Sequence, residues 1–396
     1  MRVLSIGNLY PPASVGGYEL VWQSWVAHMR ERGHEVSVLT SDHRAADTEP
    51  AADVHRDLRL YWSDHEFPEL SRREQRELER HNAEVLARRL DEDRPDAVAW
   101  WAMGGMSLSL LERVRRRGLP AIGVVCDDWM LYGPKVDAWA RRYAGHPRAA
   151  AFAERRTGLV ARIELGTAAH WLFLSETVRR RAREGGVGLG DSEICNRGAD
   201  DKLFAPAPAR EWSGRLAYVG RIDERKGIAT AIEALAELPG AELVVDGAGD
   251  ERHATELREL AERLGVAERV RFQNSAREDV PGVYADADAV VFPVTWDEPW
   301  GLVPLEAMSV GRPVVATGRG GSGEYLNDRR NCLLFAPGDA GALAAAVREL
   351  AGDAELRGRL VQAGYETAAR FSERAFNEQI ERAVVRVVAA GRGGVA

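Results

Sequence analysis

The sequence predicts an α/β protein with two doubly wound parallel sheets, and three observations lead to this fold class. The chain has 396 residues, too many for one ordinary core and suited to two domains of roughly 200 residues each. Apolar runs of strand length alternate with helical patterns along most of it. The alternation stops at a proline-rich stretch, residues 200–214, and then starts again. Functional groups are therefore expected at the carboxyl ends of strands, in a cleft between two domains.

The first half opens with a strand, a helix and a second strand. Residues 2–7, RVLSIG, have the composition of a buried parallel strand, and the amphipathic stretch that follows ends at Gly33. Further strands are expected at 35–40, 96–102, 120–126 and 170–175, and helices at 71–94 and 107–117. The helix at 71–94 carries seven arginines against seven acidic residues, which favours a solvated surface helix over a membrane-binding one.

The second half repeats this pattern after the extended linker DDKLFAPAPAREWSG. Strands are expected at 215–220, 241–247, 269–273, 288–294 and 313–317, and helices at 227–238, 251–265, 281–285 and from about 302. The predicted organisation is a Rossmann-like domain over residues 1–203, a second over 204–375, and a final helix, 376–396, that packs back toward the first domain.

Composition excludes several classes of function. The net charge of -8 argues against a general nucleic-acid binder. The three cysteines have no metal-binding or redox spacing, and the first apolar run is broken by Asn8 and two prolines, unlike a signal peptide. No apolar window is long enough to span a membrane. These features predict a cytoplasmic protein.

A basic loop follows the first strand of the second half. In GRIDERKG, Arg221 and Lys226 lie just before a helix, so two cations and free backbone N–H groups gather where an anion would dock. Lysine is rare here, with 3 of 53 basic residues, which favours a specific role for Lys226 over a solvated loop. The loop therefore predicts a phosphate or diphosphate site.

Two carboxylates flank a Trp-Gly turn in DEPWGLVPLEAM. Pro299 and Gly301 predict an irregular turn, and the next helix is expected to start between about Leu302 and Pro304, which places Glu306 in its first turn. There the helix dipole alone accounts for Glu306, whereas Glu298, in the loop before the helix, has no such simple explanation.

These two segments resemble the signature of retaining glycosyltransferases of the large family four. That family has the GT-B fold, with two Rossmann-like domains facing across a cleft, and it shows a G-R-x4-K-G motif followed by an E-x7-E motif. The order and spacing here are similar. NLYPPASVGGYE and FLSETVRRRAREGGV also resemble the family's first domain, so the likeness covers nearly the whole chain.

The resemblance implies an acceptor-binding first domain and a second domain that binds a nucleoside diphosphate sugar, UDP- or GDP-linked, without a further cofactor. Arg221 and Lys226 would hold the diphosphate, Glu298 would contact the donor sugar and Glu306 the ribose. The remaining donor-binding residues implied are backbone groups of Gly301, Leu302 and Val303, the close approach allowed by Gly16 and Gly17, and a base-binding segment at 273–277 that includes Asn274.

The first domain departs from the family pattern at VVCDDWMLYGP. Where many relatives carry a histidine, Cys126 occupies the position or Asp127 or Asp128 takes over its polar role, so the two aspartates are candidate catalytic residues. A metal site at this aspartate pair is disfavoured, because adjacent residues on one loop rarely chelate together. The resemblance also implies metal-independent catalysis.

The predicted function is that of a retaining glycosyltransferase, a hexosyltransferase, that uses a front-face mechanism in carbohydrate, glycoconjugate or natural-product biosynthesis. A nucleotide-sugar epimerase, a phosphorylase of the same fold and a non-catalytic sugar-nucleotide-binding module remain alternatives. A dehydrogenase is disfavoured, because GNLYPPASVGG is not a GxGxxG turn.

The segment 141–183 contains ten arginines against three acidic residues. This surplus fits an anionic acceptor, peripheral membrane contact or a solvated face. The sequence leaves open the acceptor class, the donor base and sugar, and the oligomeric state.

Overall fold

We describe a computed structural model of the chain, which covers residues 1–13, 16–43, 52–62 and 66–393. Its contacts divide the chain into two compact units. Unit 1 consists of Met1–Cys195 and Asn377–Ala396, and unit 2 of Asn196–Phe376. The divisions thus fall at 195/196 and 376/377, compared with the boundaries at 203/204 and 375/376 expected from the sequence.

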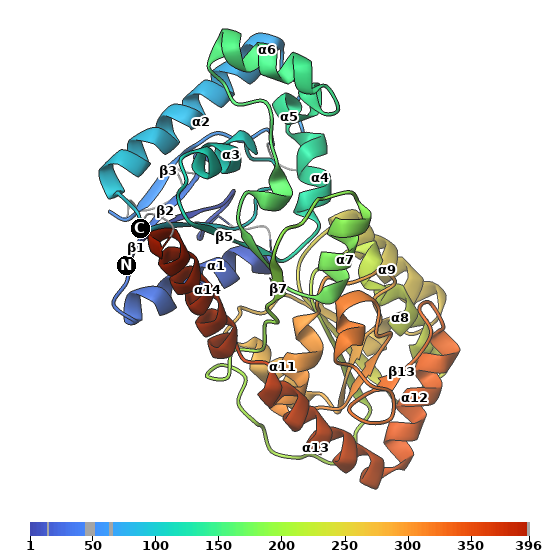
Figure 1. The fold of residues 1–396 in the computed structure, drawn as a ribbon. Coiled ribbons are helices and arrows are strands. Elements are labelled where there is room, and N and C mark those ends of the chain that lie inside the picture. The colour runs from blue at the N-terminus through green and yellow to red at the C-terminus, as the bar shows by residue number, and fades with distance from the viewer. Residues whose placement is uncertain (14–15, 44–51, 63–65, 394–396) are drawn as a thin grey trace. The chain divides into compact units, whose positions relative to one another are not determined.

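The described residues of unit 1 form a parallel sheet with the strand order β3-β2-β1-β4-β5-β6-β7 (Figure 1). The strands are β1 (Arg2–Ile6), β2 (Glu35–Ser41), β3 (Val54–Leu58), β4 (Ala97–Trp100), β5 (Ala121–Val125), β6 (His170–Phe173) and β7 (Ser192–Ile194). The short outer strands β3 and β7 escape sequence prediction, because neither is an apolar run. The strand order reverses beside β1, so the loops after β1 and β4 border the point where such sheets bind ligands.

Side-chain capping helps to set where a helix of unit 1 begins, as the start of α2 shows. Ser71 and Glu74 form a reciprocal capping box at the start of α2. The helices are α1 (Gly17–Glu31), α2 (Arg72–Asp93), α3 (Ser109–Arg116), α4 (Trp129–Val136), α5 (Ala138–Tyr143), α6 (Pro147–Thr157), α7 (Glu176–Glu184), the 3₁₀ turn Leu165–Thr167, and α14 (Glu373–Gly393) from Asn377 onward.

Tryptophans fill much of the core of unit 1. The rings of Trp22 and Trp101 stack with centroids 6.1 Å apart, and the indole N–H of Trp22 donates to Ser5 Oγ at 2.6 Å. Trp100 and Trp171 are completely buried among the apolar residues of the sheet. This packing fixes the strand ends that present the loops of the unit.

The described residues of unit 2 form a second parallel sheet, with the order β10-β9-β8-β11-β12-β13. The strands are β8 (Arg215–Val219), β9 (Glu242–Asp246), β10 (Val270–Gln273), β11 (Ala289–Phe292), β12 (Val314–Ala316) and β13 (Leu333–Leu334). Here the order reverses beside β8, which pairs with β9 on one side and β11 on the other. The loops after β8 and β11 are therefore neighbours at the carboxyl edge of the sheet.

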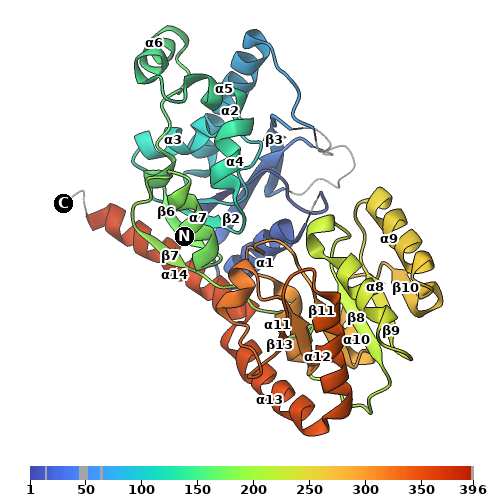
Figure 2. The ribbon, with the colours of Figure 1, turned by 90° about the vertical axis from the view of Figure 1, so that its right-hand side faces the viewer.

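Helices cover both faces of this sheet (Figure 2). One face packs with α8, α9 and α12 into a continuous apolar core that includes Leu216, Ile232 and Val347. The helices of unit 2 are α8 (Ile228–Ala236), α9 (Glu251–Arg263), α10 (Val280–Asp286), α11 (Leu302–Val310), α12 (Ala340–Gly352), α13 (Ala354–Arg370) and the 3₁₀ turns Glu224–Lys226, Ala267–Arg269 and Gly320–Glu324.

The position of Glu306 in its helix corrects one expectation. Gly301 has a φ of 83°, which suits glycine and ends the preceding loop, so α11 begins at Leu302. Glu306 is then the fifth residue, beyond the first turn where it was expected. Because the helix-end field falls off within the first turn, the dipole does not account for this carboxylate.

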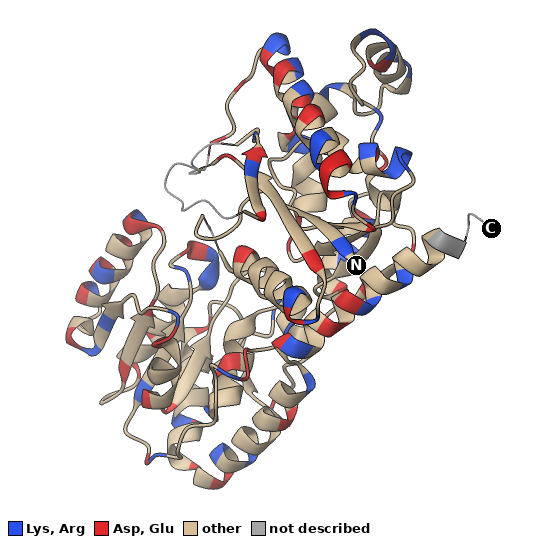
Figure 3. Ribbon diagram, turned by 90° about the vertical axis from the view of Figure 1, so that its left-hand side faces the viewer, with Lys and Arg blue, Asp and Glu red and all other residues tan. Residues whose placement is uncertain are grey.

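The surface carries both signs of charge. Figure 3 shows acidic and basic residues interspersed over the face that it presents. Among the described residues, no helix combines the length and apolar character that a bilayer crossing requires.

Candidate active site

The loop after β8 presents two arginines, Arg221 and Arg225, around one carboxylate. Asp223 accepts hydrogen bonds from the backbone N–H of Arg225 at 3.0 Å, from its guanidinium at 2.8 and 2.9 Å, and from Arg221 at 3.3 Å. These donors hold the pKa of Asp223 well below its usual range. Asp223 thereby caps the 3₁₀ turn Glu224–Lys226 and orients Arg221, whose side chain is 47% exposed.

This loop is joined to the loop after β11 through backbone groups. Thr295 donates its N–H and its hydroxyl to the carbonyl oxygen of Arg225, at 2.9 and 3.2 Å. Gly227 has a φ of 69°, and a Cβ there would lie 2.0 Å from the carbonyl oxygen of Pro293. Glycine is required at this position for both reasons, and it lets the two loops approach closely.

Lys226 and Glu298, which are 72 positions apart in the chain, form an ion pair between these loops. Lys226 Nζ lies 2.6 Å from Glu298 Oε2, and both side chains are largely buried, at 18% and 13% exposure. The indole N–H of Trp296 donates to the same oxygen at 3.0 Å. The structure thus brings together two residues that the sequence assigned to the diphosphate and the sugar.

Other loops support Glu298 and the turn that follows it. The N–H of Gly321 donates to the Glu298 carbonyl oxygen at 2.7 Å, and a Cβ on Gly320 would lie 2.4 Å from the same atom. The Tyr325 hydroxyl donates to the carbonyl oxygen of Gly301. Leu302 and Val303 begin α11, so their N–H groups belong to the first turn, which has no carbonyl partners within the helix. These amides are available to an anion.

Glu306 is buried, with 4% exposure, and both of its carboxylate oxygens accept hydrogen bonds. Arg277 donates to Oε1 at 3.1 Å and the Tyr284 hydroxyl to Oε2 at 2.9 Å. Burial and the adjacent Glu306 raise the pKa of Tyr284 well above its usual value, so its hydroxyl keeps the proton that it donates. Arg277 also stacks over Phe204 at 5.1 Å.

Asn274 lies in the loop after β10, between two residues fixed by Asp246. The Gln273 side chain donates to Asp246 Oδ2 at 3.0 Å, and Ser275 donates to the same carboxylate from its N–H at 2.8 Å and its hydroxyl at 2.6 Å. Asp246 is buried, with 2% exposure, and its hydrogen bonds to the residues on both sides of Asn274 fix the shape of the segment expected to bind the base.

In unit 1, the two aspartates after β5 have different surroundings. Asp127 accepts from the Trp129 N–H at 3.0 Å and the Tyr132 hydroxyl at 3.1 Å, and burial raises its pKa to about 6. Asp128 forms an ion pair with Arg181. Cys126 is 8% exposed, and its N–H bonds the Tyr18 hydroxyl at 3.3 Å.

Gly16 and Gly17 stand at the start of α1. Neither has a positive φ, and a Cβ on either would meet no atom within 4 Å. The described part of the protein itself therefore does not require glycine at these positions. One reason for glycine at positions 16 and 17 is that it leaves space beside the backbone for another molecule.

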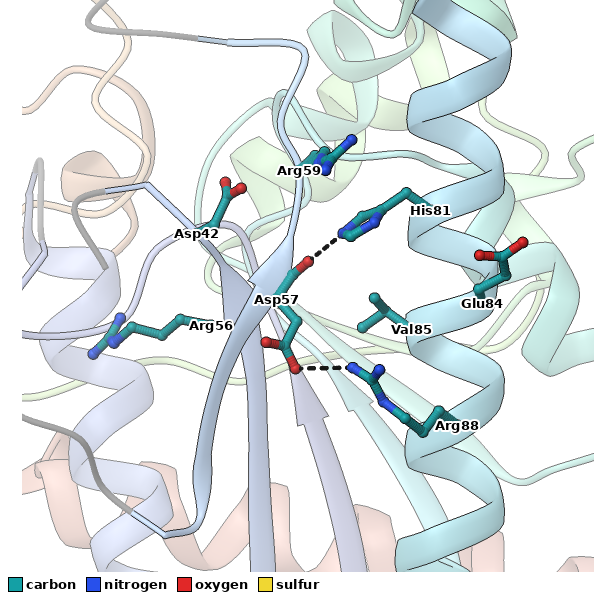
Figure 4. Close-up of a pocket in the computed structure, with 8 residues that line it drawn as sticks. All are labelled: Asp42, Arg56, Asp57, Arg59, His81, Glu84, Val85 and Arg88. Carbon is teal, nitrogen blue, oxygen red and sulfur yellow. Dashed lines mark hydrogen bonds and ion pairs between the residues drawn. The ribbon is translucent and has the colours of Figure 1, made fainter. Parts of the chain in front are cut away.

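Unit 1 also contains a pocket of about 510 Å³ between β3 and α2 (Figure 4). His81 Nε2 lies 2.7 Å from the Asp57 carbonyl oxygen, and Arg88 pairs with the Asp57 carboxylate at 3.3 Å. The lining contains none of the site residues expected from the sequence. Among the described residues, no group of three or more histidine, cysteine or carboxylate side chains is arranged to hold a metal ion.

Sequence reasoning missed several residues that the site contains. Asp223 lies inside the basic motif and Trp296 lies two residues before Glu298, so proximity was an available signal for both. Tyr284 was missed as well, and Arg277 was expected only as part of the base-binding segment. Both reach Glu306 from more than twenty positions away, and no pattern in the sequence indicates those contacts.

Two family models match the chain, one to each unit for the most part. The model described as Glycosyltransferase Family 4 matches residues 15–203, and the model described as Glycosyl transferases group 1 matches residues 200–367. A lipopolysaccharide core biosynthesis glycosyltransferase, LpsE of Rhizobium meliloti, is 40% identical over 178 residues, which are 45% of this chain and 50% of that protein. The chain spans about half the length of the curated relatives it matches.

Two solved structures match over nearly the whole chain. Sucrose-phosphate synthase from Thermosynechococcus elongatus has a TM-score of 0.75 at 22% identity, covering 98% of this chain and 99% of that one. Anabaena Alr3699/HepE in complex with UDP and glucose has a TM-score of 0.69 at 20% identity, covering 97% and 99%. At these identities the likeness shows the fold, which is the two-domain GT-B fold.

Proposed function

Since the chain belongs to the group 1 and family 4 glycosyltransferases, whose models together match residues 15–367, we propose that it transfers a hexose from a nucleoside diphosphate sugar to an acceptor hydroxyl. The observation that carries this proposal is the joined pair of loops after β8 and β11. They gather Arg221, Lys226 and Glu298 at the switch point of the unit 2 sheet, next to the first-turn amides of α11. A UDP donor is the first to test, because the structure of HepE contains UDP and glucose.

The charges fit a departing diphosphate. When the bond between the anomeric carbon and the phosphate oxygen breaks, its electron pair stays on the diphosphate. Cations and helix amides aimed at that group stabilise the transition state more than the bound donor. Arg221, Lys226 and the amides of Gly301, Leu302 and Val303 supply those groups, and no metal ion is needed for this role.

The sugar and ribose have separate carboxylates in this proposal. Glu298 accepts from the donor sugar, Glu306 from the ribose, and the loop around Asn274 contacts the base. Glu298 is already hydrogen-bonded to Lys226 and Trp296, which favours a binding role over that of a nucleophile. We therefore propose a front-face reaction, in which the acceptor oxygen bonds the anomeric carbon while its proton passes to a departing phosphate oxygen, with retention of configuration.

Unit 1 supplies the polar group near the reacting sugar in this proposal. Asp127 fits better than Asp128, because Asp128 is paired with Arg181 whereas Asp127 contacts neutral donors and has a pKa raised to about 6. Cys126 is too buried for the role. Gly16 and Gly17 would admit the diphosphate close to the backbone, and Asp127 would accept from a sugar hydroxyl.

The test is nucleotide release from UDP-, GDP-, TDP- and ADP-glucose, with and without sugar and sugar phosphate acceptors, in buffer that contains EDTA. We expect release from one donor, stimulated by an acceptor and unchanged by EDTA, and an anomeric configuration in the product that matches the donor by NMR. Isomerised nucleotide sugar without release would instead indicate an epimerase, and tight binding without turnover a binding module.

Among single substitutions, Lys226→Ala tests the assignment of the donor site most directly. Removal of its charge should lower donor binding or turnover by about tenfold or more, the scale of one charge-assisted contact. Lys202→Ala, which removes an exposed lysine of the same unit, is the matched control and should behave as the wild type. Near wild-type kinetics of Lys226→Ala would refute the site assignment.

A further inference from the structure

We propose that Trp296 is a positioning residue, which holds Glu298 in place for the donor sugar when the diphosphate draws Lys226 away. This inference rests on the proposed function, since it concerns the same donor site. It adds a residue that belongs neither to the pair Glu298 and Glu306 nor to the basic motif.

Lys226 and Trp296 donate to one and the same carboxylate oxygen. Nζ of Lys226 lies 2.6 Å and Nε1 of Trp296 lies 3.0 Å from Glu298 Oε2. The carboxylate is 13% exposed, so solvent offers few replacements for either donor. When one of the two donors is lost, the other therefore becomes the main hydrogen-bond partner that holds this oxygen in place.

The two donors to Glu298, Lys226 and Trp296, differ in charge. A diphosphate competes with Glu298 for the ammonium group of Lys226, because both are anions and each draws Nζ toward itself. The indole N–H is neutral and has no such attraction to the phosphate. It is the donor that stays with Glu298 at the moment when the sugar must be oriented.

The indole ring of Trp296 is itself held in position. The guanidinium carbon of Arg225 lies 4.5 Å from the ring centroid and Lys226 Nζ lies 5.7 Å from it, both within cation–π range. Arg225 is in turn fixed by Asp223, which accepts from its guanidinium at 2.8 and 2.9 Å. The chain of contacts runs from Asp223 through Arg225 and Trp296 to Glu298.

The two loops do not depend on the indole for their connection. Thr295 bonds the Arg225 carbonyl oxygen twice, and Gly227 packs directly against the backbone of Pro293. Trp296→Phe, which keeps an aromatic face under Arg225 and removes the N–H donor together with the smaller ring of the indole, is therefore expected to fold. Its unfolding midpoint should lie close to that of the wild type.

The experiment measures kcat and KM for hydrolysis of whichever of the four nucleotide-glucose donors turns over fastest. Trp296→Phe should lower kcat about tenfold while the donor KM changes less than about threefold, because the lost bond orients the sugar and not the diphosphate. Trp212→Phe is the matched control. Trp212 also lies under an arginine of unit 2, at 5.5 Å from Arg357, but it precedes β8 at the opposite end of the strand.

A double-mutant cycle with Glu298→Ala separates positioning from a direct or structural role. If Trp296 acts through Glu298, Trp296→Phe should lower kcat by no more than about twofold in the Glu298→Ala background. An equal loss in both backgrounds, wild-type kinetics of Trp296→Phe, or its failure to fold would each overturn the inference while leaving the proposed function intact. A wild-type protein that releases nucleotide from no donor would refute the proposed function and this inference with it.

Discussion

Three carboxylates of unit 2, Asp223, Glu298 and Glu306, have basic partners before any ligand is present. Asp223 holds Arg221 and Arg225, Glu298 holds Lys226, and Glu306 holds Arg277. A carboxylate that is largely buried needs such partners, because removing its charge from water is costly. The same pairs hold the charged side chains near the positions where a sugar nucleotide would bind. Binding then exchanges existing contacts for new ones, and few free side chains have to be ordered.

Glu306→Gln tests the ribose role at this scale. The amide matches the carboxylate in shape, and the Tyr284 hydroxyl can turn to accept from it, so the fold should be kept. A ribose hydroxyl would then donate to a neutral oxygen, which is weaker by about 1 kcal/mol, so UDP binding measured by calorimetry should weaken by about fivefold to tenfold. Glu233→Gln, at an exposed position of α8, should leave the affinity unchanged. Unaltered affinity of Glu306→Gln would remove Glu306 from the nucleotide site.

The sequence predicted which residues contribute to the candidate site, but it predicted few of the contacts between them. The motifs around Lys226 and Glu298 predict groups at two strand ends, and the sheet order then makes the loops neighbours. Glu306 shows the limit, since the dipole explanation fails and its partners Arg277 and Tyr284 come from segments whose approach depends on tertiary packing. Element positions were predicted well where strands are apolar, and missed at β3, whose residues VHRDL are mostly polar.

At the scale of helices and loops, a buried polar network joins three helices of unit 1. Glu79 of α2 is 1% exposed and accepts from the Tyr61 hydroxyl at 2.8 Å and from the Ser109 hydroxyl at the start of α3. Asp137 caps α5 and also accepts from the N–H of Leu108, at 2.8 Å. Burial raises the pKa of Glu79, and burial together with Glu79 raises that of Asp137 to about 8.

Glu79→Gln should reduce the pH dependence of stability that this network creates. A carboxyl group with a raised folded-state pKa binds its proton more tightly in the folded protein. Its contribution is complete below about pH 4 and is lost as pH rises through the folded pKa, at about 1.4 kcal/mol per pH unit for each proton. The free energy of unfolding, measured with urea from pH 5 to 8, should therefore fall less steeply in Glu79→Gln than in the wild type.

The control for this measurement is Glu77→Gln on the same helix. Glu77 is exposed and pairs with Arg73 in the preceding turn, so Glu77→Gln should keep the pH slope of the wild type. Equal slopes in Glu79→Gln and the wild type would show that Glu79 is ionised in the folded protein.

At the scale of the whole molecule, two places compete as nucleotide sites: the joined loops of unit 2 and the pocket between β3 and α2 in unit 1. The pocket has volume for a ligand, but Asp57 already contacts both His81 and Arg88. The loops of unit 2 have cations, a switch point and helix amides directed at one region.

Hydrogen exchange with and without UDP distinguishes the two places. A ligand that binds the folded state raises the free energy of opening by RT ln(1 + [L]/Kd), about 2.7 kcal/mol at a hundredfold excess over Kd, and slows exchange about a hundredfold where opening breaks the site. We expect protection over 220–228, 273–277 and 294–306. The peptides over 54–59 and 78–88 should exchange as in the free protein, because they line the unit 1 pocket. Protection confined to those two peptides would place the nucleotide in unit 1 and overturn the assignment of unit 2 as the donor-binding unit.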